Sequence, residues 1–206
     1  RHGETNGNKA GRIQGSTDIP LNEYGIELAK ITRDGIEKEG LQFDIIYASP
    51  LSRARKTAEI VRGTHTTEIV IDDRIVDFGK AEGMLIKDIN EKPENQNLKY
   101  CFTIPSKYQA KDGAESYEHI MARAKDFLEN ELRPLEHTYE NVLVVCHGAL
   151  IRALLLNVLG WDIDRYWEIH QPNCCMNLVT LKDGKFNLAY MEKIYYEGDV
   201  AAKGIL

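Results

Sequence analysis

The chain has 206 residues, of which 43% are apolar and 28% charged, and its formal net charge is −6. This length suits one ordinary domain with a substantial core, and the composition is typical of a globular protein rather than a disordered one. The acidic balance argues against nucleic-acid binding, which needs a basic surface. No apolar run approaches the roughly 18 residues of a membrane span, so we expect no membrane partner.

The cysteines indicate the cellular compartment of the protein. The four cysteines, Cys101, Cys146, Cys174 and Cys175, are few for the length and lack the spacing of a zinc site. We interpret them as free thiols in a reducing compartment, and we therefore expect a cytoplasmic protein. The sequence is compatible with a monomer and with a homodimer.

The hydrophobic pattern predicts strands that alternate with helices. We expect helices over residues 21–40, 49–62, 116–132 and 149–159, and strands over 43–48, 68–72 and 141–146. Asn22 is the expected N-cap of the first helix, and Pro50 is expected in the first turn of the second. A hairpin of 178–181 and 186–191 is expected around Asp183-Gly184.

Alternating strands and helices indicate an α/β fold. We expect three layers, with a mainly parallel sheet and helices on both faces. The segment 141–146 is apolar enough for a strand that is buried on both faces. The polar stretch 86–113 contains Pro93 and Pro105, and we interpret it as an irregular insertion within a single domain, 1–206. This insertion is expected to cover the substrate crevice and to select the substrate.

Two histidines are each followed by glycine, in Arg1-His2-Gly3 and in Cys146-His147-Gly148. Imidazole is substantially neutral near pH 7 and offers a nucleophile, and guanidinium forks match the oxygens of a phosphate. Ligands of parallel sheets bind beyond the carboxyl ends of the strands, where His147 and residues 49–53 are expected. These residue types therefore point to phosphoryl transfer through a histidine.

The order of the motifs resembles the histidine phosphatase superfamily, which includes cofactor-dependent phosphoglycerate mutases and many broad phosphomonoesterases. The matching pieces are Arg1 to Thr5, Asn8, Arg12 to Gly15, Ser49 to Ala54, and Cys146 to Arg152. The resemblance implies a histidine acid-type phosphatase that hydrolyses small phosphorylated metabolites through a phosphohistidine on His2, without a metal or a cofactor. It also implies that an apolar strand precedes Arg1.

The resemblance assigns the other site residues. Arg1 and Arg53 are the expected phosphate clamps, because arginine offers paired donors to the oxygens of the transition state. His147 is expected to donate a hydrogen bond to the phosphate. The other expected phosphate- or substrate-binding residues are Asn8, Arg12, Gln14, Gly15 and Gly148. Arg55 is interpreted as an exposed residue and Cys146 as a core residue.

The proton donor is the least determined part of the site. The family's donor glutamate lies four residues before the first glycine of a Phe-Gly-x-x-Glu-Gly segment, here residues 78–83, and that count falls on Ile75. A deletion of two residues would instead place Asp77 in this role. Glu82 is a second candidate, and a site without a protein acid is a third.

Two other functions stay open at this point. A cofactor-dependent phosphoglycerate mutase would share the histidine pocket, but the family's mutases have an Asn-Gly-rich stretch after the second His-Gly. This chain has Ala149 to Arg152 there, the form found in the phosphatases. A non-catalytic protein that binds phosphate esters is suggested by Ile75. In each case the expected partner is a small-molecule phosphate ester.

Overall fold

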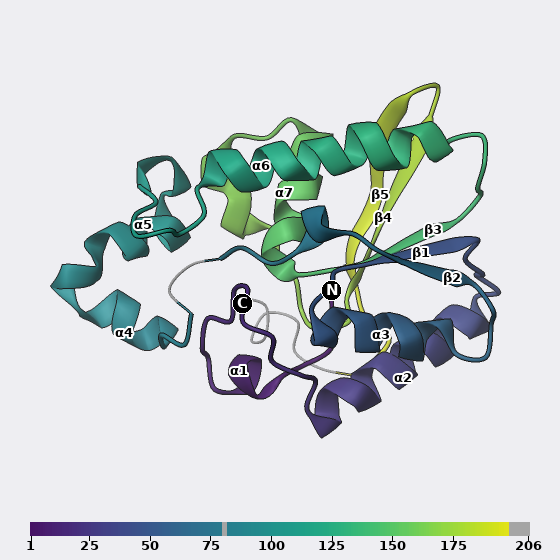
Figure 1. Cartoon of the computed structure of the whole chain (residues 1–206), viewed down its shortest axis with the longest axis horizontal. Coiled ribbons are helices and arrows are strands. Elements are labelled where there is room, and N and C mark those ends of the chain that lie inside the picture. Colours follow the sequence, from purple (N-terminus) through teal and green to yellow (C-terminus); the bar gives the residue numbers. More distant parts are fainter. Residues whose placement is uncertain (80–81, 198–206) are drawn as a thin grey trace.

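Helices and strands alternate along most of the chain (Figure 1). The computed structural model describes residues 1–79 and 82–197. The helices are α1 (Asn6–Lys9), α2 (Glu23–Lys38), α3 (Ser52–Arg62), α4 (Ile86–Glu91), α5 (Gln96–Thr103), α6 (Tyr117–Asp126) and α7 (Gly148–Leu159). The strands are β1 (Ile45–Ala48), β2 (Glu68–Ile71), β3 (Val142–Val145), β4 (Met176–Lys182) and β5 (Lys185–Lys193).

A parallel sheet in the order β2-β1-β3 forms the central layer. Strand β1 lies between the other two and is buried along its whole length, because its side chains alternate between two covered faces. Ile45 and Tyr47 pack in the core cluster that contains Phe127 and Leu150, whereas Ile46 and Ala48 pack against α3. Figure 1 shows α6 above the sheet and α2 and α3 below it. The predicted three-layer α/β architecture is confirmed.

The C-terminal strands form a separate antiparallel hairpin, β4-β5. Asp183 and Gly184 join them with φ angles of 52° and 70°, as the two positive-φ residues of a tight hairpin turn require. The predicted hairpin is therefore confirmed. Asn22 also caps α2 as expected, through a bond of 2.7 Å from the backbone N–H of Gly25 to its side-chain oxygen.

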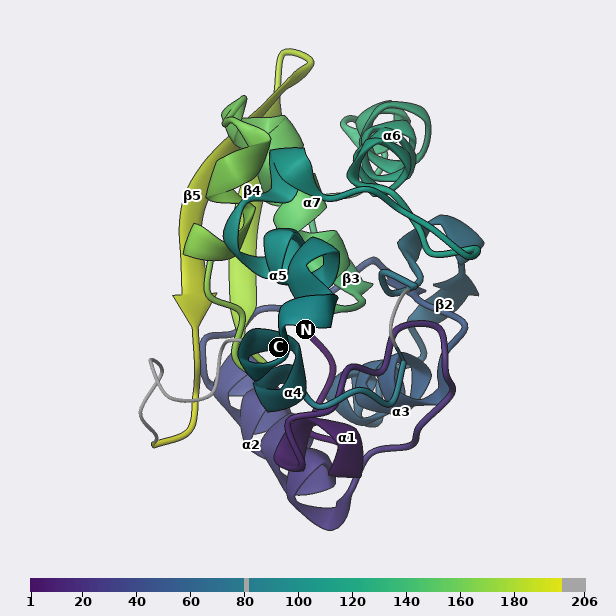
Figure 2. The same cartoon turned by 90° about the vertical axis from the view of Figure 1, so that its left-hand side faces the viewer.

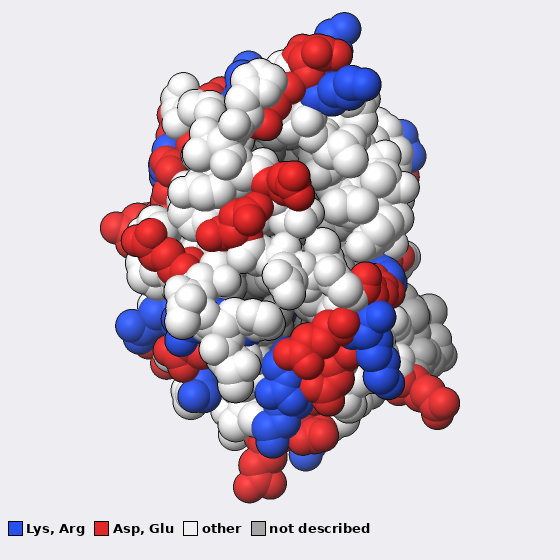
Figure 3. All heavy atoms as spheres, turned by 90° about the vertical axis from the view of Figure 1, so that its right-hand side faces the viewer, with Lys and Arg blue, Asp and Glu red and all other residues white. Residues whose placement is uncertain are grey.

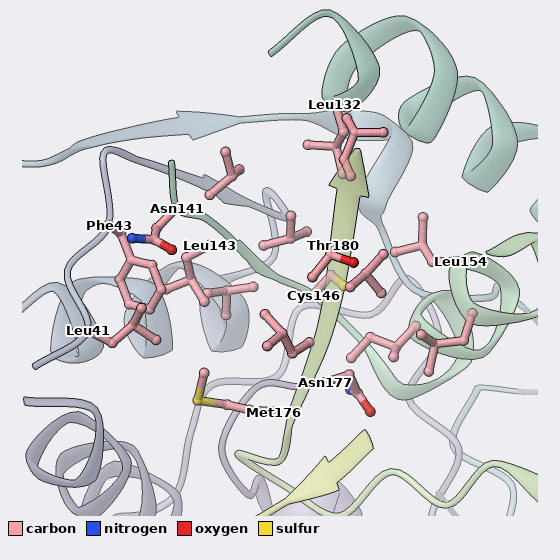
Figure 4. A pocket seen from close by; sticks show the side chains of 18 of the residues that line it. Leu41, Phe43, Leu132, Asn141, Leu143, Cys146, Leu154, Met176, Asn177 and Thr180 are labelled. Atoms are coloured by element: carbon pink, nitrogen blue, oxygen red, sulfur yellow. The ribbon is translucent and has the colours of Figure 1, made fainter. Parts of the chain in front are cut away.

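An apolar cavity of about 710 Å³ separates β3 from β4. Figure 4 shows Leu143 of β3, Leu154 of α7 and Met176 of β4 around it. The side chains of β3 pack against both core clusters, as predicted, but residues 142–144 are only partly buried because they also line this cavity. The backbone of Arg1 and His2 reaches the rim of the cavity, where it bonds Cys175 and Cys146 respectively, at 3.0 Å each.

Most of the segment 86–113 is helical, from Ile86 to Lys107, and the prediction of an irregular insertion is wrong for that part. It contains α4 and α5, and the short turns Pro93–Asn95 and Pro105–Lys107 follow these helices. Leu98, Cys101 and Phe102 recur at helical spacing, and each proline sits where the preceding helix has ended. Figure 2 looks onto this end of the molecule and shows α4 and α5 in front of the N-terminus.

The start of α3 also differs from expectation. The helix begins at Ser52 with Leu51 as its N-cap, so Pro50 precedes the helix instead of lying in its first turn. The expected helix over 116–132 is α6 followed by a π-helical turn, Phe127–Leu132.

The surface shows mixed charge. Among the described residues on the face in Figure 3, Lys and Arg side chains lie between Asp and Glu side chains and gather into no basic patch. Within residues 1–79 and 82–197, no helix has the length and apolar character needed to cross a bilayer.

We expect a short apolar strand added ahead of Arg1 to enter the cavity and stabilise the protein. Each buried Val or Ile side chain contributes about 1.5–3 kcal/mol, and each kcal/mol raises Tm by about 2–4 °C in a domain of this size, so a rise of about 10 °C is expected. Thermal unfolding measures it, with a Gly-Ser extension of equal length as the control. Equal Tm values for the two extensions would contradict a strand at this place.

Candidate active site

Two parallel strands end side by side and bring the second histidine to the site. The pairing of β1 with β3 continues for one residue beyond β1, where the N–H of Ser49 donates to the carbonyl of Val145 at 3.1 Å. His147 lies two residues beyond the end of β3, and its Nε2 lies 2.7 Å from Ser49 Oγ. The ring of His2 lies 5.1 Å from that of His147, between centroids. The fold thus joins residues far apart in sequence into one cluster.

The backbone of the N-terminal segment orients the ring of His2. Its Nδ1 lies 2.7 Å from the carbonyl oxygen of Gly3, which can only accept, so Nδ1 carries the proton and Nε2 keeps its lone pair. Asn173 donates to the carbonyl of His2 at 3.1 Å and holds the segment. A side chain at position 3 would meet the carbonyl oxygen of Gly25 at 2.4 Å, so glycine is required there by the approach of α2. His2 is 1% exposed.

Carbonyl oxygens hold the two proposed phosphate clamps. Arg53 is fully buried and donates from Nη1 to the carbonyl of Thr17 and from Nη2 to that of Gly15, each at 2.8 Å. Arg1 donates from Nη1 to the carbonyl of Gln171. These bonds fix each guanidinium in place before any ligand binds, which is the preorganisation that transition-state stabilisation needs.

Three buried nitrogen atoms of this cluster have no hydrogen-bond partner among the described residues. They are Arg1 Nε, Arg53 Nε and His147 Nδ1. Unpaired buried donors are rare because each one costs about 1–3 kcal/mol, so a group of three calls for an explanation. An anion placed between them would accept from all three.

Burial controls the charge of the imidazoles. It lowers the pKa of His2 well below 6.5, and His147 and the guanidinium groups of Arg1 and Arg53 lower this pKa further. Burial and the charges of Arg53 and Arg1 lower the pKa of His147 in the same way. Both rings are therefore neutral at pH 7. The local charge is still positive, because two arginines face one carboxylate, that of Asp77.

The structure places Asp77 beside Arg53 and His147, and it places Glu82, the other candidate acid, elsewhere. Asp77 Oδ2 lies 3.1 Å from Arg53 Nη2 and 3.7 Å from His147 Nδ1. Ile75 is 0% exposed and packs in the core, so it offers nothing to the site. Glu82 Oε1 instead accepts from the backbone and hydroxyl of Ser16 at 3.1 Å. Lys80 and Ala81 of the same motif lie outside the described residues.

A small cavity of about 50 Å³ collects most of the remaining candidates. Its lining includes Arg1, His2, Asn8, Arg12, Gln14, Gly15, Asp77 and Gly148, together with Phe78, Phe102, Ala149, Arg152 and Trp167. The larger cavity between β3 and β4 is lined mainly by aliphatic side chains, so we place the chemistry in the smaller one. Ligand sites that enclose a whole molecule measure roughly 300–1,000 Å³, so this space suits a phosphoryl group rather than a complete ester.

The candidates in the lining are held in different ways. Thr5 caps α1, and the side-chain oxygen of Asn8 accepts from the backbone N–H of Thr5 at 3.2 Å. The side-chain oxygen of Gln14 accepts from the hydroxyl of Thr5 at 2.6 Å. Arg12 donates to the carbonyl of Gly83 at 2.6 Å, near the surface. Gly148 begins α7, whose N-terminal N–H groups favour an anion.

Several supporting residues were not found from the sequence. Arg123 of α6 donates to the carbonyls of residues 74, 76 and 77 and thereby fixes the backbone at Asp77, while Glu115 holds Arg123 at 2.6 Å. Ser49 stood in a matching motif without a role. Asn173 belongs to no motif, and only the fold brings it to His2. As expected, Arg55 is exposed and Cys146 is buried, and burial raises the pKa of its thiol to about 11.

Comparison with known proteins identifies the family. The model of the histidine phosphatase superfamily, branch 1, matches residues 1–193. The chain belongs to this superfamily. Within residues 1–79 and 82–197, no group of three or more His, Cys, Asp or Glu side chains could hold a metal ion.

The relatives of this histidine phosphatase include phosphoserine phosphatases. Phosphoserine phosphatase 1 of Hydrogenobacter thermophilus is 33% identical over 186 residues, which cover 89% of this chain and 85% of that protein. The metal-independent phosphoserine phosphatase of Arabidopsis thaliana is 34% identical over 189 residues, which cover 90% of this chain and 76% of that protein. A phosphoserine phosphatase mutant of Entamoeba histolytica, solved with phosphoserine, superposes with a TM-score of 0.78, 26% identity and 93% coverage of both chains.

We expect His2 to stay neutral in the free protein as the pH falls through 6.5. Nitrogen-15 NMR of the histidine side chains measures this, and the spectrum of His2→Ala assigns the signal. Inorganic phosphate should raise the pKa, because a nearby anion favours the charged ring. A His2 signal that titrates at or above pH 6.5 without phosphate would contradict the argument from burial.

The substitution Asp77→Asn should slow the hydrolysis of an alkyl phosphate strongly and that of p-nitrophenyl phosphate only modestly. A general acid contributes roughly 10²–10⁴-fold, and an alkoxide needs its proton more than a nitrophenolate does. The ratio of kcat/KM for the two esters is the measurement, and Glu82→Gln is the matched control. If only Glu82→Gln changes this ratio, the acid is Glu82. If neither variant does, the proton comes from water or substrate.

Proposed function

We propose that this histidine phosphatase hydrolyses small phosphate monoesters through a phosphohistidine on His2. The observation that carries the proposal is the neutral, oriented imidazole of His2 beside the unpaired donors of Arg1, Arg53 and His147. A nucleophile with a free lone pair needs no separate base, and the donors match the charge that spreads over the phosphoryl oxygens. The names of the relatives support the same reaction.

The reaction then has two steps. The bound ester, as its monoanion, first passes its proton to the carboxylate of Asp77. Nε2 of His2 then attacks phosphorus in line with the leaving oxygen, the P–O bond breaks, and Asp77 gives this proton to the alkoxide. In the second step Asp77, now a carboxylate, accepts a proton from water, and the water oxygen attacks the phosphohistidine to release phosphate and neutral His2. Arg1, Arg53 and His147 hold the transferred group throughout. His147 donates from Nδ1 when Ser49 donates its hydroxyl proton to Nε2.

We also propose that the enzyme works in mildly acidic solution, as the prediction of an acid-type phosphatase implies. The low pKa of His2 supports this, because the nucleophile stays neutral below the usual range of histidine. Four free, buried cysteines support a reducing compartment such as the cytoplasm. Phosphoserine is the first substrate to test, since two relatives that align with most of the chain are named phosphoserine phosphatases.

His2→Ala should abolish turnover and leave the fold intact, because the reaction loses its nucleophile. The measurements are phosphate release and thermal unfolding, with exposed His65→Ala as the control. The wild type should carry phosphate that is acid-labile and base-stable during turnover, and His2→Ala should carry none. Turnover by His2→Ala at the wild-type rate would contradict the phosphohistidine. Net phosphate release from 3-phosphoglycerate, without isomerisation, separates a phosphatase from a mutase.

A further inference from the structure

Ser49 links the end of β1 to the ring of His147. It follows β1 directly and is 0% exposed. Its backbone N–H donates to the carbonyl of Val145 in β3 at 3.1 Å, so strand pairing sets its position. Among the described residues, its side-chain oxygen bonds Nε2 of His147 at 2.7 Å and the backbone N–H of Leu51 at 3.4 Å. The hydroxyl of Ser49 is therefore held next to an imidazole of the site.

The second contact of this hydroxyl decides where its proton points. The N–H of Leu51 can only donate, so Ser49 Oγ accepts from it. If Nε2 of His147 carried a proton, the oxygen would receive two donors, and the hydroxyl proton would have no acceptor among the described residues. A buried donor without an acceptor costs stability. Ser49 therefore donates its proton to Nε2, which is the unprotonated nitrogen of the ring.

The other nitrogen of this ring, Nδ1, faces the site. In a neutral imidazole one nitrogen carries the proton, and the hydrogen bond made by the other nitrogen selects it. Nδ1 of His147 is buried, has no hydrogen-bond partner among the described residues and lies 3.7 Å from Oδ2 of Asp77. A lone pair on Nδ1 would repel this carboxylate and any phosphate oxygen beside it. Both sides of the ring thus favour a proton on Nδ1.

The choice of tautomer matters because the ring is neutral. Burial lowers the pKa of His147 well below 6.5, and the charges of Arg53 and Arg1 lower it further, so the ring has a single N–H at pH 7. Since Nε2 is bonded to the serine, this N–H can meet a phosphate only from Nδ1. His2 has the same tautomer, fixed by the carbonyl of Gly3, but offers its unprotonated nitrogen. The two neutral rings therefore take opposite parts, one with a lone pair and the other with a donor.

We propose that Ser49 is a positioning residue whose hydroxyl holds His147 in the Nδ1–H tautomer, so that the neutral ring donates to the transferred phosphoryl group. The inference rests on the proposed function, in which His147 holds this group, and it adds the residue that makes His147 a donor. Without the hydroxyl, the proton can move to Nε2, and Nδ1 then presents a lone pair to the phosphoryl oxygens.

Proton–nitrogen correlation spectra of the nitrogen-15-labelled protein read the tautomer directly, with the ring signals assigned through the bonds of each side chain. In the phosphate-free wild type at pH 7, His147 should carry its proton on Nδ1. Ser49→Ala should move a measurable fraction of this proton to Nε2. Ser49→Thr keeps a hydroxyl and should keep the wild-type tautomer.

Hydrolysis of p-nitrophenyl phosphate shows what the tautomer does to the reaction, because this ester needs little help from an acid. Ser49→Ala should lower kcat by about tenfold or more, up to the roughly 10²–10³-fold that the loss of a transition-state donor costs. Ser49→Thr should recover most of the rate. Ser106→Ala is the matched control, since it removes a serine hydroxyl that bonds Asp164 at the surface and should change neither the tautomer nor kcat.

Three results would overturn the proposal. The first is a proton on Nε2 in wild-type His147, whether or not any variant folds. The second is a folded Ser49→Ala that keeps the Nδ1–H tautomer, and if this variant is slow all the same, Ser49 is a structural residue. The third is a changed tautomer with the wild-type kcat. Thermal unfolding shows which variants fold.

Failure of the proposed function is distinguishable from these results. If the wild type does not turn over p-nitrophenyl phosphate, the proposed function is wrong. The spectra need no turnover, so they still decide whether Ser49 sets the tautomer of His147.

Discussion

The site depends on the burial of two imidazoles and two guanidinium groups where β1, β3 and the N-terminal segment meet. Burial keeps the histidines neutral, so His2 has a lone pair. It also keeps the arginines out of water, and this strengthens their attraction for an anion. The same burial leaves donors unpaired, at a cost in stability. In the proposed function, a bound phosphate accepts from these donors and offsets that cost.

The supporting structure serves to hold this cluster still. Carbonyl oxygens of Thr17, Gly15 and Gln171 fix the guanidinium groups, and Gly3 fixes the tautomer of His2. Arg123 of α6, in the helical layer above the sheet, donates to the carbonyl of Asp77 and fixes the backbone there. Donors held rigidly in this way can stabilise the charge of a transition state without first changing their own positions.

The proposed function separates substrate choice from chemistry in space. The reacting atoms sit at the strand ends, whereas α5 and the loop after α7 supply the wall with Phe102 and Trp167. On this proposal, changes in the 86–113 segment alter the substrate without disturbing His2. Such a division suits a family in which relatives of similar fold carry different substrate names.

The sequence alone determined the family, the alternation of strands and helices, and the two His-Gly motifs, because these are local patterns of residue type and spacing. It could not choose between Asp77, Glu82 and a site without a protein acid, since only the tertiary structure shows that Asp77 reaches Arg53 while Glu82 bonds Ser16. Nor could it show Asn173 at His2, or Arg152 beside Arg1. Those contacts join residues up to 171 positions apart, and only tertiary packing brings such residues together.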